Sequence, residues 1–350
     1  FWTEFSNFAS YQSRMEDRRL TYVRRFFNLA AHQTGHPNKY MDTVTVEASG
    51  LTRVYGNRAA VNDVSFTLSK GEVLGFLGPN GAGKSTTMKM LTGNLAASAG
   101  TVKICGIDIV ENPKEAKALI GYLPEQPPLY RELTVSEFLA LAARLHRVSG
   151  SHVKKAVQVA MERCGLTDMS KRLIENLSKG YQQRVGIAQA IIHNPMVVIL
   201  DEPTIGLDPI QIRDIRALIK ELGGEHSVIL STHILPEVEM ICDHVQIIHK
   251  GQLVFNGSID VLRQQRHGNK LLLGLNNPPA NEELLKIPGV QTIDTLPNGL
   301  LRVRYAEGQM PTEALVQAAV SNGWGLHQIN PDQTTLEEVF VQLTFQEAEA

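Results

Sequence analysis

One segment combines glycines, a lysine and a hydroxyl side chain at a spacing that suits phosphate binding. Residues 78–85, Gly-Pro-Asn-Gly-Ala-Gly-Lys-Ser, match the pattern GxxxxGK[ST] between an apolar run and a helix-compatible stretch. The glycines let consecutive backbone N–H groups turn towards phosphate oxygens, and a helix N-terminus adds a favourable dipole. Lys84 would supply charge to the β- and γ-phosphates, and Ser85 a hydroxyl ligand for Mg²⁺. The predicted nucleotide-binding loop consists of Gly78, Pro79, Asn80, Gly81, Ala82, Gly83, Lys84, Ser85 and Thr86.

Two adjacent acids end a second apolar run. Residues 197–200 are all apolar, as in a buried central parallel strand, and Asp201 and Glu202 follow directly. The carboxyl ends of parallel strands meet at one edge of a sheet, so we expect both acids beside the phosphate loop. Asp201 is then predicted to hold Mg²⁺ through water. Glu202 is predicted to orient or deprotonate the attacking water.

Three further segments resemble motifs of one family, the ATP-binding-cassette (ABC) proteins. Residues 177–184, Leu-Ser-Lys-Gly-Tyr-Gln-Gln-Arg, resemble the LSGGQ signature, and residues 205–208, Ile-Gly-Leu-Asp, resemble the D-loop. Residues 231–233, Ser-Thr-His, follow an apolar run and resemble the switch histidine motif. Tyr55 lies upstream, where the family places an aromatic ring under adenine. The order and spacing over residues 42–260 resemble an ABC transporter ATPase.

This resemblance implies a head-to-tail dimer of two cassettes that hold ATP between them. Ser178 and Gly180 of one copy would donate to the γ-phosphate bound by the other copy. His233 would contact that phosphate and hold Glu202 and the water in place, while Asp208 would couple the two sites. The implied cofactors are ATP and Mg²⁺. The implied partners are a second cassette and a membrane-spanning permease at the cytoplasmic face of the membrane, with no nucleic acid.

The sequence departs from the family pattern at two places. Lys179 and Tyr181 stand where the signature has glycine and glutamine. After residues 121–124, the position of the family's metal-contacting Q-loop glutamine holds Glu125, with Gln126 next, and either residue fits that role. Leu-Pro-Glu here and Leu-Ser-Lys-Gly-Tyr later both resemble the ATPases of drug-, sodium-, copper- and gliding-type exporters.

Composition limits the alternatives. The chain has 350 residues and a formal net charge of −2, which argues against a dedicated nucleic-acid binder. Its three cysteines form no CxxC pair, so the sequence predicts neither a disulfide scaffold nor a cysteine zinc site. No apolar run approaches the ~18 residues that span a bilayer, so a transport role requires another chain to cross the membrane.

The pattern of apolar residues predicts an α/β fold. We expect a P-loop cassette over residues 41–265, with a parallel-sheet core, an antiparallel β part and a helical subdomain at about 126–185. Strands are predicted near 44–46, 64–68, 73–77, 197–200 and 228–230, and a closing hairpin over 245–254. Thr134 and Glu137 form a capping box for one helix, a second helix covers about 151–164, and a third follows Asp208-Pro209.

The two ends of the chain differ from the cassette. Residues 268–350 are predicted to form a small α+β accessory domain with strands near 271–273 and 300–303 and helices near 281–285, 312–320 and 336–343. Residues 1–40 are rich in basic and aromatic side chains. They form an N-terminal extension that is either a leader or a misplaced start before Met41, or a basic amphipathic helix around 22–29 on a membrane surface.

Two other functions compete with transport. A soluble ABC ATPase could act on ribosomes or DNA, but ribosomal members usually carry two cassettes, and GxxxxGK[ST] occurs here once. DNA-repair members insert a long coiled coil between the positions of Lys84 and Asp201, and the sequence leaves no room for one. A metal-binding regulator would use His233, Cys242, His244 and His249, whose spacing is not diagnostic of a metal site. The expected function is therefore the ATP-hydrolysing subunit of an exporter, with a soluble non-transport ATPase as the alternative.

Overall fold

The computed structural model describes residues 44–264, 269–306, 308–332 and 340. The predictions for residues 1–40 and the helix predicted at 336–343, Phe340 excepted, lie outside the described residues. Within the described part of the chain, no helix is long and apolar enough to cross a membrane.

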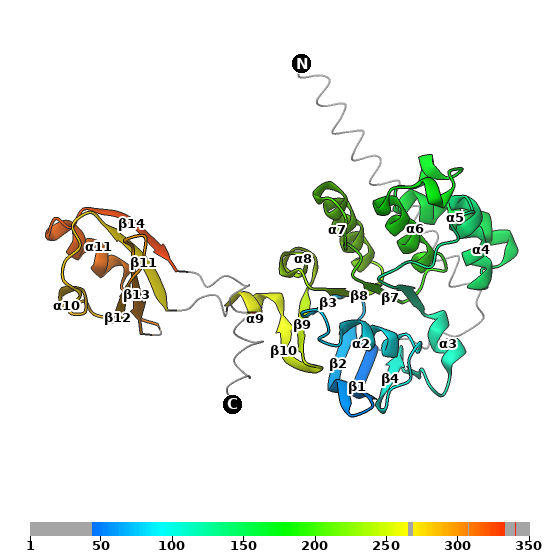
Figure 1. Cartoon of the computed structure of the whole chain (residues 1–350), viewed down its shortest axis with the longest axis horizontal. Coiled ribbons are helices and arrows are strands. Elements are labelled where there is room, and N and C mark those ends of the chain that lie inside the picture. The colour runs from blue at the N-terminus through cyan, green and yellow to red at the C-terminus, as the bar shows by residue number, and fades with distance from the viewer. Residues whose placement is uncertain (1–43, 265–268, 307, 333–339, 341–350) are drawn as a thin grey trace, which may run out of the picture. The chain divides into compact units, whose positions relative to one another are not determined.

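Two sheets form the framework of residues 44–264 (Figure 1). The first is antiparallel in the order β2-β1-β4-β5, and the second has the order β10-β9-β3-β8-β7-β6. In the second sheet every pairing is parallel except the hairpin of β9 and β10. The strands are β1 (Val44–Tyr55), β2 (Arg58–Ser69), β3 (Val73–Leu77), β4 (Ala99–Ile104), β5 (Ile107–Asp108), β6 (Ile120–Leu123), β7 (Val197–Asp201), β8 (Ser227–Thr232), β9 (His244–His249) and β10 (Gln252–Ser258).

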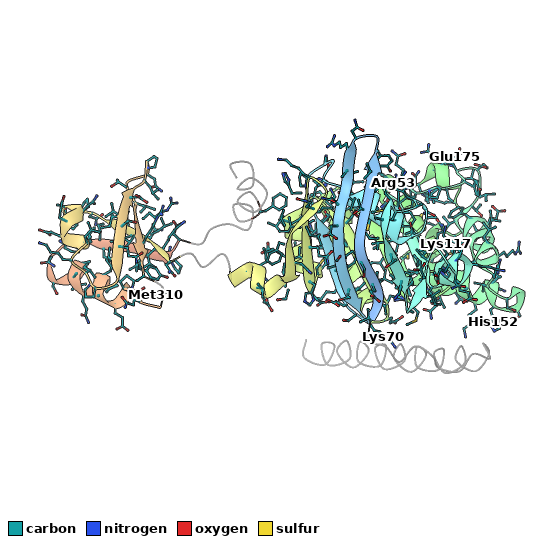
Figure 2. The ribbon with its side chains drawn as sticks, turned by 90° about the horizontal axis from the view of Figure 1, so that it is seen from below. Arg53, Lys70, Lys117, His152, Glu175 and Met310 are labelled. Atoms are coloured by element: carbon teal, nitrogen blue, oxygen red, sulfur yellow. The ribbon has the colours of Figure 1, made fainter. Side chains whose placement is uncertain are left out.

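Helix α2 (Lys84–Leu91) contacts both sheets and so links them into one core. Its Met88 and Leu91 are fully buried and belong to the same apolar cluster as Phe66 of β2 and Phe76 of β3. Figure 2 shows the long strands β1 and β2 side by side on one face of this part of the chain, with Arg53 of β1 labelled. The phosphate loop therefore starts and ends in rigid, buried structure.

The register of the parallel sheet brings three strand ends to one edge. Leu77 of β3 pairs with Thr232 of β8, and Asp201 of β7 pairs with Ser231 of β8. The chain leaves β3 into the phosphate loop, leaves β7 into Glu202 and leaves β8 into His233. Because the neighbouring strands end at the same level, their polar side chains share one site.

Helices cover the rest of the parallel sheet and form a second apolar cluster. Helix α4 begins with the predicted capping box, in which Thr134 Oγ1 accepts from the backbone N–H of Glu137 and the Glu137 carboxylate accepts from the backbone N–H of Thr134. The helices are α3 (Pro113–Ala118), α4 (Val135–Leu145), α5 (Gly150–Arg163), α6 (Lys179–Ile191), α7 (Pro209–Gly223), α8 (Leu235–Ile241) and α9 (Ile259–Gln264), with short 3₁₀ turns at Thr167–Met169 and Ile174–Asn176.

A separate sheet and apolar core belong to the residues described between 269 and 332. The element order is β11 (Lys270–Leu275), α10 (Asn281–Leu284), β12 (Val290–Thr295), β13 (Leu301–Tyr305), α11 (Thr312–Ser321) and β14 (Leu326–Pro331). The strands pair antiparallel in the order β12-β13-β11-β14. This β-α-β-β-α-β arrangement is the split β-α-β of ferredoxin-like folds. Leu273, Val303 and Leu315 are fully buried in its core.

The predicted fold class is confirmed: a parallel-sheet core, an antiparallel part and helices, with an α+β unit after them. The strands predicted at 73–77 and 197–200 and the hairpin at 245–254 are confirmed with small differences at their ends. Strands β4, β5, β6, β12 and β14 had no counterpart in the prediction. The domain boundaries stay predictions.

Candidate functional site

Two glycines of the phosphate loop have positive φ angles, which residues with a Cβ rarely adopt. Gly83 has φ 115°, and a Cβ there would lie 2.7 Å from the carbonyl oxygen of Ala60. Gly81, with φ 78°, is exposed at the tip of the loop. At the base, the Gly78 N–H donates to Thr232 O at 3.3 Å, which ties the loop to the end of β8.

The remaining loop residues lie around this turn. Pro79 O accepts from the Ala82 N–H at 3.2 Å, and Ala82 O accepts from the Gly251 N–H at 2.9 Å, so the β9–β10 turn braces the loop. Asn80 is exposed and Thr86 is half-buried on α2. The loop thus presents its tip outward while its base is held from two sides.

Lys84 is buried, with 6% of its side chain exposed, at the first position of α2. Its Nζ donates to Gly78 O at 2.8 Å and lies 3.2 Å from Glu202 Oε1. A buried ammonium ion needs such partners because an unpaired charge costs several kcal/mol. The predicted phosphate-binding lysine and the predicted catalytic acid are therefore in direct contact.

Asp201 lies between two hydroxyl groups. Its Oδ1 accepts from Ser85 Oγ at 3.3 Å and from Ser231 Oγ in a shorter contact. Burial raises the pKa of Asp201, and the hydrogen bonds from Ser231 and Ser85 oppose that rise. Carboxylate and hydroxyl oxygens are the ligands that Mg²⁺ prefers, so Ser85 and Asp201 fit that ion.

Glu202 is held in a strained conformation that aims its carboxylate into the site. Its φ is 50°, in the left-handed region that costs about 1–2 kcal/mol for a residue with a Cβ. Its backbone N–H donates to both O and Oγ of Ser231 at 3.1 Å. The carboxylate spans two partners, since Oε1 faces Lys84 and Oε2 lies 2.9 Å from His233 Nδ1. Such strain at a polar cluster is typical of functional sites.

The signature-like segment lies at the start of α6 and contacts the start of α7. Ser178 is the exposed N-cap of α6, and its Oγ accepts from the backbone N–H of Tyr181. A Cβ on buried Gly180 would lie 2.6 Å from the side chain of Gln211 on α7, so a larger residue would require Gln211 to move. Asp208 caps α7 by accepting from the N–H groups of Ile210 and Gln211 at 3.0 and 2.9 Å.

The predicted site residues thus fall into two groups. Lys84, Ser85, Asp201, Glu202 and His233 are joined by hydrogen bonds and ion pairs through Ser231 and one another. Within the described ranges, no hydrogen bond or ion pair connects Ser178, Gly180 or Asp208 to that group. We call the first group the catalytic cluster and the second the signature surface.

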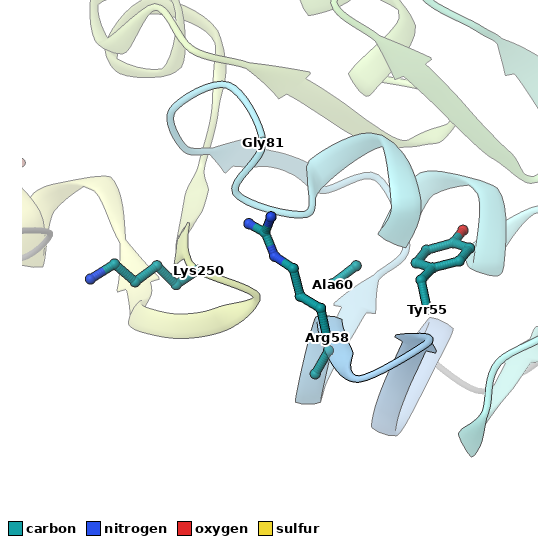
Figure 3. Close-up of a pocket in the computed structure, with 6 residues that line it drawn as sticks. Tyr55, Arg58, Ala60, Gly81 and Lys250 are labelled. Atoms are coloured by element: carbon teal, nitrogen blue, oxygen red, sulfur yellow. The ribbon is translucent and has the colours of Figure 1, made fainter.

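A cavity of about 560 Å³ opens beside the loop tip (Figure 3). Its lining comprises Tyr55, Arg58, Ala59, Ala60, Gly81 and Lys250. In Figure 3 the Arg58 guanidinium points towards the loop near Gly81, and the exposed Tyr55 ring stands at the other side of the opening. An aromatic face with a cation next to a phosphate loop suits a base linked to phosphates.

The two Q-loop candidates do not join the catalytic cluster. Glu125 and Gln126 are both exposed in the segment after β6. In the described part of the chain, neither side chain makes a hydrogen bond or ion pair with Ser85 or Asp201. Their metal role stays a prediction.

Sequence reasoning gave no role to several residues that complete the site. Ser231 bonds both Asp201 and Glu202, and its place at the polar end of the apolar strand β8 was a usable signal. Arg58 and Lys250 line the cavity from β2 and from the β9–β10 turn. No motif marks these two basic residues, because only the fold brings them to the loop.

Comparison with known proteins gives consistent matches along most of the chain. The family model described as ABC transporter matches residues 61–205. The model described as the C-terminal domain of DrrA1-3-like ATP-binding proteins matches residues 257–344.

Among curated relatives, the bacitracin transport ATP-binding protein BcrA of Bacillus licheniformis is 35% identical over 308 residues, covering 87% of this chain and 98% of that protein. The linearmycin resistance ATP-binding protein LnrL of Bacillus subtilis is 31% identical over 305 residues, covering 85% and 98%.

Two solved structures show the same architecture. An ATP-binding subunit of an ABC transporter matches with a TM-score of 0.58 and 33% identity, over 63% of this chain and 92% of that one. A dimeric ATP-binding cassette in a post-hydrolysis state, bound to ADP and Pi, matches with a TM-score of 0.56 and 25% identity, over 61% and 98%. Lys84, Ser85, Asp201, Glu202, Ser178 and Gly180 lie within residues 61–205, which the ABC transporter family model matches.

Proposed function

Because this chain belongs to the family of ABC transporter ATP-binding subunits, and is thus an ATPase that energises transport, we propose that two copies close on ATP to drive a membrane-spanning exporter. The observation that carries the proposal is the contact of Glu202 with both Lys84 and His233. An acid poised between a phosphate-binding cation and a histidine suits the activation of water for attack on a phosphate.

In this proposal the triphosphate changes the partners of Lys84. The Lys84 ammonium ion turns from Glu202 Oε1, now 3.2 Å away, towards the β- and γ-phosphate oxygens. Glu202 Oε1 is then free to accept a proton from the attacking water, while Oε2 keeps its contact with His233. His233 fixes the direction of the carboxylate and reaches the γ-phosphate with its other ring nitrogen.

Ser85 and Asp201 are the side chains that would hold Mg²⁺ next to the phosphates. When bound, this ion neutralises charge on the β- and γ-phosphate oxygens. Asp201 is already aligned by Ser231, so its carboxylate needs little reorganisation. Burial raises the pKa of Asp201, and binding of a divalent ion would favour its charged form.

Within one chain, the signature surface makes no hydrogen bond or ion pair with the catalytic cluster in the described residues. Closure of two copies would bring the signature surface of one copy to the catalytic cluster of the other. A two-fold dimer makes each contact twice, so the phosphate loop of one copy meets Ser178 and Gly180 of the other. The exposed N-terminus of α6 offers backbone N–H groups to an anion. Hydrolysis removes the phosphate that bridges the copies, and opening follows.

The transported molecule is carried by another chain in this proposal. Relatives named for bacitracin transport and linearmycin resistance match nearly end to end, which supports an exporter. The proposed location is the cytoplasmic face of the membrane, bound to a permease. Residues 268–350 would form an accessory domain that tunes closure or permease docking, and residues 1–40 an extension outside the chemistry.

The test combines partner capture with turnover. The full chain is purified from membranes with its bound proteins identified, and phosphate release is measured with ATP and Mg²⁺. We expect a membrane-spanning partner, and turnover that Glu202→Gln abolishes. If the chain hydrolyses ATP but is recovered only with soluble partners, the result would contradict the exporter proposal and favour a soluble non-transport ATPase.

A further inference from the structure

Glu237 is a fully buried carboxylate outside the catalytic cluster. It lies on α8 with 0% of its side chain exposed. Its Oε2 accepts from Thr232 Oγ1 at 2.9 Å, and its Oε1 lies 3.3 Å from Arg216 Nη2. A buried carboxylate without partners would cost several kcal/mol, so the fold keeps it only with both contacts in place.

The Thr232 hydroxyl extends this contact into the loop that carries His233. Thr232 Oγ1 donates to Glu237 and accepts from the backbone N–H of Ile234 at 3.0 Å. The hydroxyl therefore fixes the backbone on both sides of His233. His233 Nδ1 in turn lies 2.9 Å from Glu202 Oε2, so the direction of the histidine ring depends on this loop.

Arg216 connects the same carboxylate to the helix that starts at the signature surface. It lies on α7, whose first turn is capped by Asp208, eight residues or about 12 Å along the helix axis. A helix moves as a rigid element, so a displacement of its capped end reaches Arg216 and then Glu237. The loop at the end of β8 and helix α7 thus meet at one buried side chain.

We infer that Glu237 is a positioning residue that holds the Thr232–Ile234 loop, with His233 aimed at Glu202, and links it to α7. The inference rests on the proposed roles of His233 and Glu202. Glu237 touches no reacting atom, and it acts through Thr232. Its loss leaves nucleotide binding intact and slows the chemical step, because only the direction of His233 changes.

A purely structural ion pair is the alternative explanation, and the chain offers a matched control for it. Glu225 pairs with Arg163 at 3.0 Å, is partly buried, and lies just past the other end of α7. Glu225→Gln removes a carboxylate from an ion pair without touching the loop at His233. Glu237→Gln makes the same change at the proposed positioning site.

The experiment measures kcat and KM for ATP with the full chain and Mg²⁺, at a temperature where circular dichroism shows every variant folded. Glu237→Gln and Thr232→Val should each lower kcat about tenfold with KM within about twofold. Thr232→Ser, which restores the hydroxyl, should return kcat close to the parent value. Glu225→Gln should lower the melting temperature and leave kcat unchanged.

Two results would overturn the inference. One is a kcat for Thr232→Val and Glu237→Gln that equals that of Glu225→Gln, and the other is a Thr232→Ser variant as slow as Thr232→Val. Thr232→Val carries the test even where Glu237→Gln does not fold. Glu202→Gln is included in the same assay. If Glu202→Gln hydrolyses ATP at the parent rate, the proposed function of the site itself fails. If Glu202→Gln is inactive while Thr232→Val and Glu237→Gln keep the parent kcat, only the role of Glu237 is contradicted.

Discussion

The catalytic cluster and the signature surface differ in how complete they are within one chain. Lys84, Asp201, Glu202 and His233 contact one another or share Ser231, and strands β3, β7 and β8, which lead into these positions, end in register. The signature surface instead consists of two capped helix ends, and within the described residues no hydrogen bond or ion pair connects Ser178, Gly180 or Asp208 to the catalytic cluster.

This difference indicates a division of labour. Water activation is built into each subunit, because buried polar groups need their partners at all times. Recognition of the γ-phosphate from the far side is left exposed, so it can be completed by a second copy. Under the proposed function, this arrangement would make hydrolysis of ATP depend on closure of the two subunits.

The largest expected effect comes from breaking the catalytic cluster alone. Glu202→Gln should abolish turnover and leave ATP binding intact, because an amide cannot accept the water proton but still fits between Lys84 and His233. Steady-state phosphate release and equilibrium ATP binding measure the two effects. Glu111→Gln, at an exposed position, is the control and should match the parent. Normal turnover of Glu202→Gln would remove Glu202 from its proposed role.

A mixing experiment tests whether the two regions work across subunits. Ser178→Arg should abolish turnover by blocking the signature surface, and Glu202→Gln by disabling the cluster. In a head-to-tail dimer each site combines the catalytic cluster of one copy with the signature surface of the other. In a mixed dimer, one site therefore carries both substitutions, and the other site carries neither. Mixing the two inactive proteins should therefore restore part of the phosphate release. A mixture as inactive as its components, with mixed dimers shown to form, would contradict the division between the two regions.

A third, smaller effect separates stability from function within the cluster. Burial raises the pKa of Asp201, because the folded protein disfavours the charged carboxylate. The folded state is therefore most stable below the ordinary pKa of an aspartate, and its free energy of unfolding falls as pH rises through the raised pKa. Asp201→Asn removes that cost at neutral pH. The melting temperature without nucleotide should rise by about 2–4 °C, the shift that ~1 kcal/mol gives a domain of this size. Added ATP and Mg²⁺ should then stabilise the variant less than the parent.

Asp168→Asn, at an exposed position, serves as the control for this prediction and should change neither quantity. A melting temperature of Asp201→Asn below that of the parent would show that the charged carboxylate is stabilised by Ser231 and Ser85 more than it is penalised by burial.

The same two regions show what the sequence could predict. Asp201 and Glu202 were expected beside the phosphate loop because parallel strands end at one edge, and the contacts of Ser85 with Asp201 and of Lys84 with Glu202 agree with this. The contact of His233 with Glu202 was expected only from the family resemblance. The link from Arg216 through Glu237 to Thr232 was not identified. Its members come from three separate elements, and only packing reveals that Glu237 is buried.

Some strands escaped prediction for simple physical reasons. Strand β4 begins Ala-Gly-Thr, without the alternation of apolar residues that marks a half-buried strand. Strand β14 has only partly buried and exposed residues and ends at Pro331, which weakens both the pattern and the propensity. Tertiary pairing, rather than local sequence, decides these segments.

The smallest expected effect concerns the C-terminal end of α6, the helix whose N-terminus carries Ser178 of the signature surface. His193 follows α6 and stacks on His146, the C-terminal cap of α4, with ring centroids 3.9 Å apart. It also shares a hydrogen bond with Ile120 O at 3.1 Å. Burial, with His146 and His226 as further causes, lowers the pKa of His193 to about 3. Acid should therefore weaken the packing at the C-terminal end of α6, the helix whose N-terminus belongs to the signature surface.

Acid lowers the free energy of unfolding because His193 binds a proton less readily in the folded state than in the unfolded state. Above pH ~6.5 the imidazole is neutral in both states and adds no pH dependence. As pH falls from there towards about 3, the unfolded chain takes up a proton that folded His193 refuses, so stability falls by up to about 1.4 kcal/mol per pH unit. The neighbouring His146 and His226, whose pKa values are also lowered by burial, act in the same direction, and Arg163 beside His226 remains charged throughout.

His193→Phe keeps an aromatic ring against His146 but removes the titrating group. Its melting temperature should fall less between pH 7.5 and 5 than that of the parent, although it is lower at pH 7.5 because the hydrogen bond to Ile120 is lost. His152→Gln, on the exposed face of α5, should keep the parent's pH dependence. If the melting temperature of His193→Phe fell with acid as steeply as that of the parent, the stack of His193 on His146 would not be the source of acid sensitivity at the end of α6. The comparison between the signature surface and the catalytic cluster would then not extend to their response to pH.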